Sequence, residues 1–335
     1  MQALVTGGGG FLGSAIVKQL IQRADRVRVL GRNRYAELEA LGAEAVQADI
    51  RDADRVAGAC RGVDVVYHVA GRAGLGGPCR LFYETNTLGT KNVLDGCRRH
   101  DVPRLVHTSS PSVAFGAGDQ CGIDESHPYP DRWLAHYPHS KALAEQMVLR
   151  ANGDGGLMTC AIRPHLIWGP GDRQLVPRLW ERARRGRLRR VGPGDNLIDI
   201  VYVDNAAEAH LAAADRLTSP EEAPAGRAYF ISQGEPVPCW EWIDRLLALK
   251  DLPPVQRSIS FNAAWRLGAM LEAVWAMLRL RSDPPMTRFL AAQLAKSHYF
   301  DISAARRDLG YQPRVSTEEG MRRLEGWLAG GMLSD

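Results

Sequence analysis

The sequence contains few cysteines and carries little net charge, and both shortages limit the class of protein it can be. Its six cysteines are spread over 335 residues without a Cys-x-x-Cys pair or a His/Cys spacing typical of metal ligands. We therefore expect reduced thiols. The net charge is only +4, and the one strongly basic stretch, Arg178 to Arg190, contains no recognition motif. No nucleic-acid partner is expected.

Signals for export and for metal binding are also lacking. The chain starts with an apolar strand pattern and a glycine loop, without the charged region and apolar core of a signal peptide. This pattern favours a cytoplasmic protein. His136 and His139 have no companion histidine or carboxylate at ligand spacing, so we predict no metal.

A long uninterrupted apolar run is absent as well. The most apolar stretch, Phe261–Leu280, is broken by Arg266, Glu272 and Arg279, which argues against a transmembrane span. Three interpretations stay open: a buried or dimer-facing helix, a wall for a long apolar substrate, and contact with a membrane interface. All three require an apolar helix face.

Short apolar runs alternate with helical segments through the first half of the chain. The expected strands are Ala3–Val5, Val27–Leu30, Ala45–Ala48, Val63–His68, Leu105–Thr108 and Cys160–Ile162. Phe11–Ile21 and Asn86–Arg99 have helical apolar periodicity. Strands separated by helix-length segments indicate an α/β fold, namely a Rossmann-like, doubly wound parallel sheet.

The second half is less regular and richer in Gly-Pro loops, which indicates a smaller C-terminal substrate lobe. We expect residues 1–165 to form the NAD(P)-binding domain, with 198–232 returning to it through strands Ile198–Val203 and Ala228–Ile231 and a helix Asp204–Arg216. Residues 166–197 and 233–335 would form the lobe.

A glycine loop connects the first expected strand to the first helix. Gly7, Gly10 and Gly13 fit the G-x-x-G-x-x-G pattern, with Phe11 and Leu12 between the last two glycines. Glycine permits the tight turn and the close approach of a pyrophosphate to the backbone, and the helix N-terminus attracts phosphate. The pattern predicts a nicotinamide dinucleotide site; the alternative is a simple glycine-rich turn.

The end of the second strand indicates which nicotinamide cofactor is bound. It offers Arg32 and no carboxylate, so we favour NADP(H), whose 2′-phosphate Arg32 can pair with, assisted by Arg34; NAD(H) is the alternative. Asp49, followed by Ile50, is placed to accept from the adenine amino group. Asp49 can instead be a helix N-cap for the segment from Asp52.

Tyr137 and Lys141 are four residues apart and therefore lie on one helix face. An ammonium beside a phenol lowers the phenol's pKa, so Tyr137 can exchange a proton with a substrate oxygen. Ser110, after the strand that ends at Thr108, can hold that oxygen, with Ser109 as the second choice. The alternatives are a surface helix pair and simple capping serines.

Further segments match the motifs of one enzyme family. They are Thr6–Gly13, Val66–Gly71, Asn86–Leu94, Thr108–Ser110, Tyr137 with Lys141, Arg163-Pro164 with Gly169–Asp172, and Val203–Asn205. Through these residues the chain resembles the extended short-chain dehydrogenases/reductases. The resemblance implies that Ser110, Tyr137 and Lys141 are catalytic, that Asn86 supports them, and that Ile50, Ala70, Tyr137 and Lys141 contact the cofactor. It also implies a homodimer.

The C-terminal half resembles the 3β-hydroxysteroid dehydrogenase branch through Pro285–Leu290, Ser297–Ile302 and Asp308–Tyr311. Ala135–Pro138 and Pro236–Pro238 are similar to bacterial reductases of long-chain olefin biosynthesis. This similarity implies NADPH-dependent reduction of a lipid-like 2-alkyl-3-oxo acid, a β-keto acid, to the 2-alkyl-3-hydroxy acid. It further implies a β-lactone synthetase and an α/β-hydrolase-fold enzyme as partners. Arg163, Arg173 and Arg178 are candidates for binding the substrate carboxylate.

Three other functions are compatible with parts of the pattern. The same residues can oxidise a 3β-hydroxysteroid or a sterol 4-carboxylate with NAD. A nucleotide-sugar epimerase or dehydratase is disfavoured by the missing acidic residue after the second strand. A non-catalytic NAD(P)-sensing protein would not need both Tyr137 and Lys141, which are present.

Overall fold

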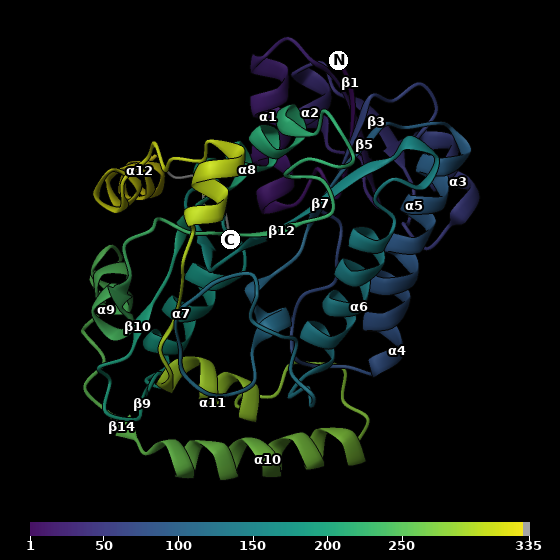
Figure 1. Ribbon diagram of the computed structural model, residues 1–335. Coiled ribbons are helices and arrows are strands. Elements are labelled where there is room, and N and C mark those ends of the chain that lie inside the picture. The colour runs from purple at the N-terminus through teal and green to yellow at the C-terminus, as the bar shows by residue number, and fades with distance from the viewer. Residues whose placement is uncertain (331–335) are drawn as a thin grey trace.

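The computed structural model describes residues 1–330, and its centre is a seven-stranded parallel sheet (Figure 1). The strand order is β3-β2-β1-β4-β5-β7-β12, which confirms the doubly wound, Rossmann-like fold. The strands are β1 (Gln2–Thr6), β2 (Arg26–Gly31), β3 (Glu44–Gln47), β4 (Val65–His68), β5 (Arg104–Thr108), β7 (Met158–Pro164) and β12 (Ala228–Ile231).

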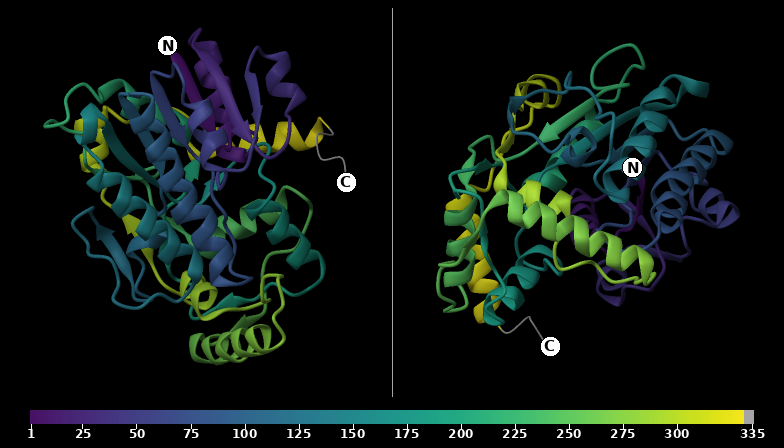
Figure 2. Two further views of the ribbon diagram at one scale, coloured as in Figure 1. Left: turned by 90° about the vertical axis from the view of Figure 1, so that its right-hand side faces the viewer. Right: turned by 90° about the horizontal axis from the view of Figure 1, so that it is seen from below.

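Helices cover both faces of this sheet (Figure 2). On one face lie α1 (Phe11–Gln22) and α8 (Val203–Arg216); on the other lie α3 (Ala53–Ala59), α5 (Gly89–Arg99) and α6 (His136–Arg150). The short α2 (Ala36–Ala40) follows β2, and α4 (Cys79–Phe82) leads through a π-helical turn, Tyr83–Leu88, into α5. The expected helix from Asn86 therefore starts as a π-helix.

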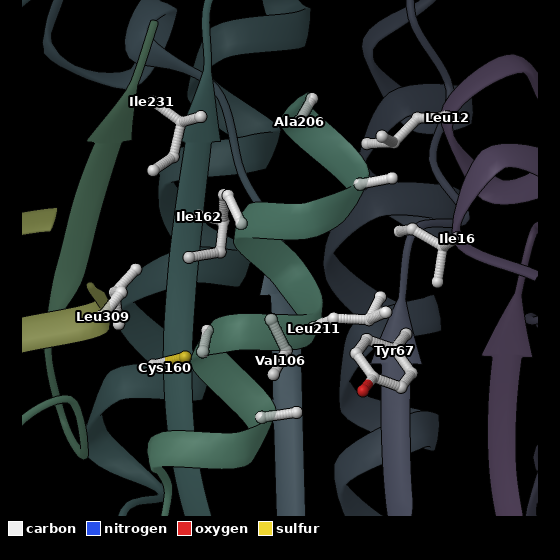
Figure 3. Packing of buried hydrophobic residues seen from close by; sticks show 14 of the residues in the cluster. Leu12, Ile16, Tyr67, Val106, Cys160, Ile162, Ala206, Leu211, Ile231 and Leu309 are labelled. Atoms are coloured by element: carbon white, nitrogen blue, oxygen red, sulfur yellow. The ribbon is translucent and has the colours of Figure 1, made fainter. Parts of the chain in front are cut away.

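Alternating residues of each strand supply the two halves of the core. Figure 3 shows one half, where Leu12 and Ile16 of α1 and Leu211 of α8 pack near Tyr67 and Val106. The neighbouring strand residues Val66 and Leu105 face the other layer. Because both faces of the strands are buried, the strands are apolar almost throughout, as parallel strands usually are.

The lobe is built mainly by the remaining elements, but it also includes residues 120–123 from the expected NAD(P)-binding domain, whereas residues 305–309 of the expected lobe pack against α8 and against β12 of the main sheet. It contains a four-stranded sheet in the order β13 (Val237–Pro238), β10 (Leu197–Ile198), β15 (His298–Phe300), β6 (Gln120–Ile123), and two strand pairs, β8 (Ile167–Trp168) with β11 (Val201–Tyr202) and β9 (Arg190–Val191) with β14 (Ser258–Ile259). Its helices are α7 (Leu175–Arg184), α9 (Cys239–Ala248), α10 (Phe261–Met277), α11 (Arg288–Ala295) and α12 (Thr317–Ala329).

One expected strand does not return to the main sheet. Residues 198–203 form parts of β10 and β11, which pair within the lobe. The interpretation of this segment as a main-sheet strand was wrong. The strand is interrupted at Asp199 and Ile200, and the two short strands on either side pair with different lobe strands. Ala228–Ile231 does return, as β12 beside β7.

The apolar helix α10 lies at one end of the molecule, outside the body, where it packs on α11 (Figures 1 and 2). Only Ala264 and Gly268 of α10 are buried, while Met270 and Met277 are 55% and 75% exposed. Interpretation of this helix as buried in the protomer is therefore wrong. Among residues 1–330, every helix is too short or too polar to cross a membrane.

Candidate active site

A cavity of about 540 Å³ opens at the carboxyl ends of β1 and β4, where the strand order reverses direction. Doubly wound folds bind ligands at this point. Its walls include nine residues that the sequence analysis singled out: Gly7, Gly10, Phe11, Leu12, Gly13, Arg32, Asp49, Ile50 and Ala70. The sequence therefore located this cavity, although it missed Tyr35 and Arg51, which also line it.

The glycine loop fits a pyrophosphate because side chains are sterically excluded from it. Gly7 has φ of +70°, and a Cβ there would lie 2.8 Å from the Ala70 backbone. At Gly13 a Cβ would lie 2.2 Å from the Gly7 carbonyl oxygen. Any residue with a side chain at this position would therefore prevent the close contact between the loop and α1. Gly10 precedes α1 without a side-chain cap, which leaves helix N–H groups available to an anion. These features suit a dinucleotide.

The part of the cavity near the end of β2 carries several arginines. Arg32 is exposed and lines the cavity, whereas Arg34 is paired with Glu39 by hydrogen bonds of 3.0 and 2.9 Å. Asp49 accepts from the Arg51 guanidinium at 3.0 and 2.8 Å, and this pairing lowers the pKa of Asp49. Asp52 accepts from the Arg55 amide and caps α3. The alternative prediction that Asp49 is the N-cap of this helix was therefore wrong.

Tyr137 and Lys141 lie on the first two turns of α6, which begins at His136. Pro138 falls in the first turn, where a proline costs no helix hydrogen bond. The Lys141 ammonium is buried and donates to the Thr108 carbonyl at 2.5 Å, with Nε2 of His107 at 3.2 Å. Burial lowers the pKa of Lys141 to about 8.

The pKa of Tyr137 is raised, against the expectation that Lys141 would lower it. Burial raises this pKa, and the hydrogen bond with Ser110 offsets only part of the increase. The ammonium of Lys141 is directed at Thr108 and His107. At neutral pH the phenol therefore keeps its proton, which suits a proton donor.

The two candidate serines face different partners. Ser110 caps the 3₁₀ helix Pro111–Ala114, accepts from the Ser112 amide at 3.2 Å, and lies beside Tyr137. Ser109 is buried and lies beside Glu145, whose pKa it helps to lower. Of the two hydroxyls, the one on Ser110 is near the phenol.

Asn86 connects the cofactor cavity to α6. Its Oδ1 accepts from the Arg72 amide at 2.6 Å, and its Nδ2 donates to the Arg72 carbonyl at 3.0 Å and to the Ser140 hydroxyl at 2.8 Å. The Ser140 hydroxyl donates to the Tyr137 carbonyl at 2.9 Å. Ser140 is a site residue that sequence reasoning missed.

Two buried histidines beside Lys141 were also missed. His68 is hydrogen-bonded to Thr6 and Thr90, at 2.7 and 2.9 Å, and its ring lies 5.2 Å from that of His107. Burial lowers the pKa of both imidazoles, with the charge on Lys141 as a further cause. Each histidine interrupts an apolar strand run, and this is the signal that could have found them.

The three arginines considered for a substrate carboxylate have different surroundings. Arg163 is buried and forms a bidentate pair with Glu145, at 2.9 and 2.6 Å. The prediction that Arg163 binds the substrate carboxylate was wrong, because Glu145 already neutralises its charge in the core. Arg178 is exposed and pairs with Asp283 at 3.1 Å, and Arg173 is exposed.

Comparisons with known proteins agree with this geometry. Residues 4–261 match the sequence pattern of the 3-beta hydroxysteroid dehydrogenase/isomerase family. A 2-alkyl-3-oxoalkanoate reductase from Stenotrophomonas maltophilia (strain K279a) is 50% identical over 328 residues, which cover 97% of this chain and 98% of that protein. One of the same name from Shewanella oneidensis is 47% identical, covering 97% of this chain and 86% of the relative.

A solved structure with the same architecture contains a nicotinamide cofactor. It is DesIV, a dTDP-glucose 4,6-dehydratase from Streptomyces venezuelae with NAD bound. The two chains are 26% identical with a TM-score of 0.76, and the match covers 98% of this chain and 97% of that one.

Proposed function

Because this chain belongs to the 3-beta hydroxysteroid dehydrogenase/isomerase family, we propose that it is an NADPH-dependent reductase that converts a long-chain 2-alkyl-3-oxo acid into the 2-alkyl-3-hydroxy acid. One observation carries the substrate class: relatives named 2-alkyl-3-oxoalkanoate reductase are 47% and 50% identical over almost the whole chain. The glycine-lined cavity beside the Tyr137 helix supports the oxidoreductase chemistry.

The proposed proton donor is Tyr137. Bound NADPH would supply a hydride to the ketone carbon, and residues of the chain would bind and protonate the ketone oxygen. The Ser110 hydroxyl donates a hydrogen bond to that oxygen and orients it, and the Tyr137 phenol transfers a proton to it as negative charge develops. The raised pKa of Tyr137 keeps this proton in place until reaction.

Lys141 and Asn86 support this step from either side. The Lys141 ammonium donates to the Thr108 carbonyl and lies near Gly71 of the cofactor cavity, so its positive charge would help to stabilise negative charge that develops on the reacting oxygen. Asn86 fixes Arg72 at the cavity wall and Ser140 on α6, so it positions the cofactor site relative to Tyr137.

The preference for NADPH rests on charge. Arg32 and Arg51 both line the cavity near the end of β2. Arg51 is paired with the carboxylates of Asp49 and Glu84, whereas Arg32 has no carboxylate partner within residues 1–330. Arg32 therefore supports a 2′-phosphate, which a planar guanidinium binds through two hydrogen bonds. NAD remains the alternative cofactor.

We further infer a cytoplasmic homodimer that acts together with a β-lactone synthetase and an α/β-hydrolase-fold enzyme. Its product carries a hydroxyl β to a carboxylate, and an acyl-activating enzyme can close these two groups into a β-lactone. Light scattering of the purified protein tests the dimer, and co-purification with the two enzymes tests the assembly.

A second candidate function is oxidation of a 3β-hydroxysteroid or a sterol 4-carboxylate with NAD. The family description favours it, and the same Ser110, Tyr137 and Lys141 would act in the reverse direction. The fold is also compatible with a nucleotide-sugar epimerase or dehydratase, since DesIV shares it, but the mostly apolar lining of the cavity among α7, α9 and α11 supports a lipid-like substrate.

Steady-state oxidation tests the proposal. A racemic long-chain 2-alkyl-3-hydroxy acid, a 3β-hydroxysteroid and a nucleotide sugar are compared with NADP and NAD, following absorbance of the reduced cofactor. The hydroxy acid is used because a β-keto acid loses carbon dioxide. We expect turnover of the hydroxy acid with NADP. Turnover of the steroid alone with NAD would overturn the proposed substrate and cofactor.

A further inference from the structure

Two separate apolar spaces adjoin the candidate active site. The first, the leucine recess, has a volume of about 320 Å³ and lies among α7, α9 and α11. Most of its lining is aliphatic or aromatic, including Leu175, Leu179, Trp242, Ile243, Leu290 and Leu294, although Arg178, Arg182 and Asp283 also line it. A recess whose surface is mostly apolar favours an apolar ligand group.

The second space, the α10 groove, has a volume of about 1110 Å³. It runs between α10 and residues 131–139, where Trp133, Trp275 and Leu280 contribute apolar surface. Charged residues also line it, among them Arg132, Glu272 and Arg279. Ala135, His136 and His139, which flank Tyr137 in the chain, also line it. One end of the α10 groove therefore lies at the start of the helix that carries the phenol.

The two spaces meet at a common wall. Leu75 and Pro284 line both of them, and Gln174 is shared by the leucine recess and the cofactor cavity. The segment before Leu75 lines the cofactor cavity through Gly71, Arg72 and Ala73. A substrate whose reacting carbon lies beside Tyr137 can thus extend one chain into each space.

The common wall is fixed by hydrogen bonds. Asp283 accepts from the amides of Leu75 and Gly76, at 2.9 and 2.7 Å, and from Arg178 at 3.1 Å. A Cβ at Gly76 would lie 2.2 Å from the Ser282 carbonyl oxygen, so the two segments are in close backbone contact. Leu75 and Pro284 therefore form a divider between the spaces.

We propose that the two spaces bind the two alkyl chains of one substrate separately, the leucine recess taking one chain and the α10 groove the other. This inference rests on the proposed function, because a 2-alkyl-3-oxo acid carries one chain on C2 and another on C3. Burial of each additional methylene in an apolar space favours binding, so the two spaces set chain-length selectivity.

The two chains are subject to different length limits. Packed helices bound the leucine recess, whereas the α10 groove is more than three times larger by volume and ends near the exposed Met277 and Leu278. We therefore expect kcat/KM to fall abruptly beyond a certain length of the chain in the leucine recess, which is a sharp limit. For the chain in the α10 groove, kcat/KM should fall gradually with length.

Two series of 2-alkyl-3-hydroxy acids test this division. One series lengthens only the C2 chain and the other only the C3 chain, from one short parent, and the readout is kcat/KM relative to that parent. In the wild type, one series should show a sharp limit. Leu179→Trp should lower the ratio for the longest member of that series by at least about ten-fold, and Ala276→Trp should act on the other series.

Two further variants keep the test independent of folding defects. Leu179→Ala enlarges the leucine recess and should extend the sharp limit to longer chains. Met270→Trp changes an exposed residue of α10 that lines neither space, and should leave both series unchanged.

Equal effects of Leu179→Trp and Ala276→Trp on both series would overturn the separate binding of the chains, as would a wild type without any sharp limit. Those results would leave the proposed function intact, because the acids would still turn over. If no member of either series is oxidised, the proposed function fails, and the inference fails with it.

Discussion

Asn86 Nδ2 donates a hydrogen bond of 2.8 Å to the Ser140 hydroxyl, and that hydroxyl donates in turn to the Tyr137 carbonyl at 2.9 Å. Because Asn86 also binds both backbone polar groups of Arg72, the wall of the cofactor cavity and the start of α6 are joined through two buried side chains. We therefore expect the position of the phenol to depend on Asn86 and Ser140.

Ser140→Ala should lower kcat by about ten-fold or more and leave the NADPH dissociation constant nearly unchanged. Loss of the hydroxyl leaves the buried Asn86 amide with one partner fewer, and small misplacement of a catalytic group is costly. Single-turnover kinetics and cofactor fluorescence measure the two quantities. Ser126→Ala, at an exposed turn, is the control, and equal losses in both variants would argue against a positioning role.

Lys141→Met should abolish most activity and yet stabilise the protein at pH 7. The folded pKa of Lys141, about 8, is below its ordinary value of 10.5, so folding disfavours the charged form. The variant should gain about 1–3 kcal/mol in the free energy of unfolding.

The gain should depend on pH in a defined direction. Between pH 8 and 10.5 the unfolded wild type binds more protons at Lys141 than the native state does, so wild-type stability rises with pH. The advantage of Lys141→Met should therefore shrink from pH 7 to pH 10. Urea unfolding at both pH values measures it, and a constant difference would contradict the assigned cause.

The sequence was informative where the chemistry is local. Glycine spacing determines whether the loop can turn at Gly7, and a separation of four residues is enough to align Tyr137 with Lys141. Pairs that depend on packing could not be predicted: Glu145 and Arg163 come from a helix and a strand, and Asp283 reaches Leu75 across 208 residues.

The helix α10 illustrates a different limit of sequence reasoning. Its apolar composition indicates that some surface covers it, but not which one. In the structure Gly268 permits close contact with Thr287 at the start of α11, and Glu272 pairs with Arg288. These contacts use one side of α10 and leave Met270 and Met277 exposed.

Glu145→Gln should destabilise the protein by about 3–5 kcal/mol, because it leaves the buried Arg163 guanidinium without a counter-charge. The double variant Glu145→Leu/Arg163→Met removes both charges and should recover much of this loss. Guanidinium chloride unfolding gives both values. Since the pair lies in the core, the KM of the double variant for the hydroxy acid should stay close to wild type. A large rise in KM would restore Arg163 as a substrate ligand.

Arg32→Ala should weaken NADPH binding by about ten-fold or more and change NADH binding little, since only the phosphorylated ribose offers a partner for the guanidinium. Cofactor titration by fluorescence measures both constants. Arg34→Ala is the matched control, because Arg34 is paired with Glu39. Equal weakening of both cofactors in Arg32→Ala would mean that Arg32 does not select between them.

The central claim, that Tyr137 protonates the substrate oxygen beside a separate cofactor cavity, is tested most directly by Tyr137→Phe. Oxidation of the 2-alkyl-3-hydroxy acid with NADP should fall by at least about 10²-fold in kcat, while NADPH binding stays within about three-fold of wild type. Turnover within a few-fold of wild type, with cofactor binding intact, would contradict the account.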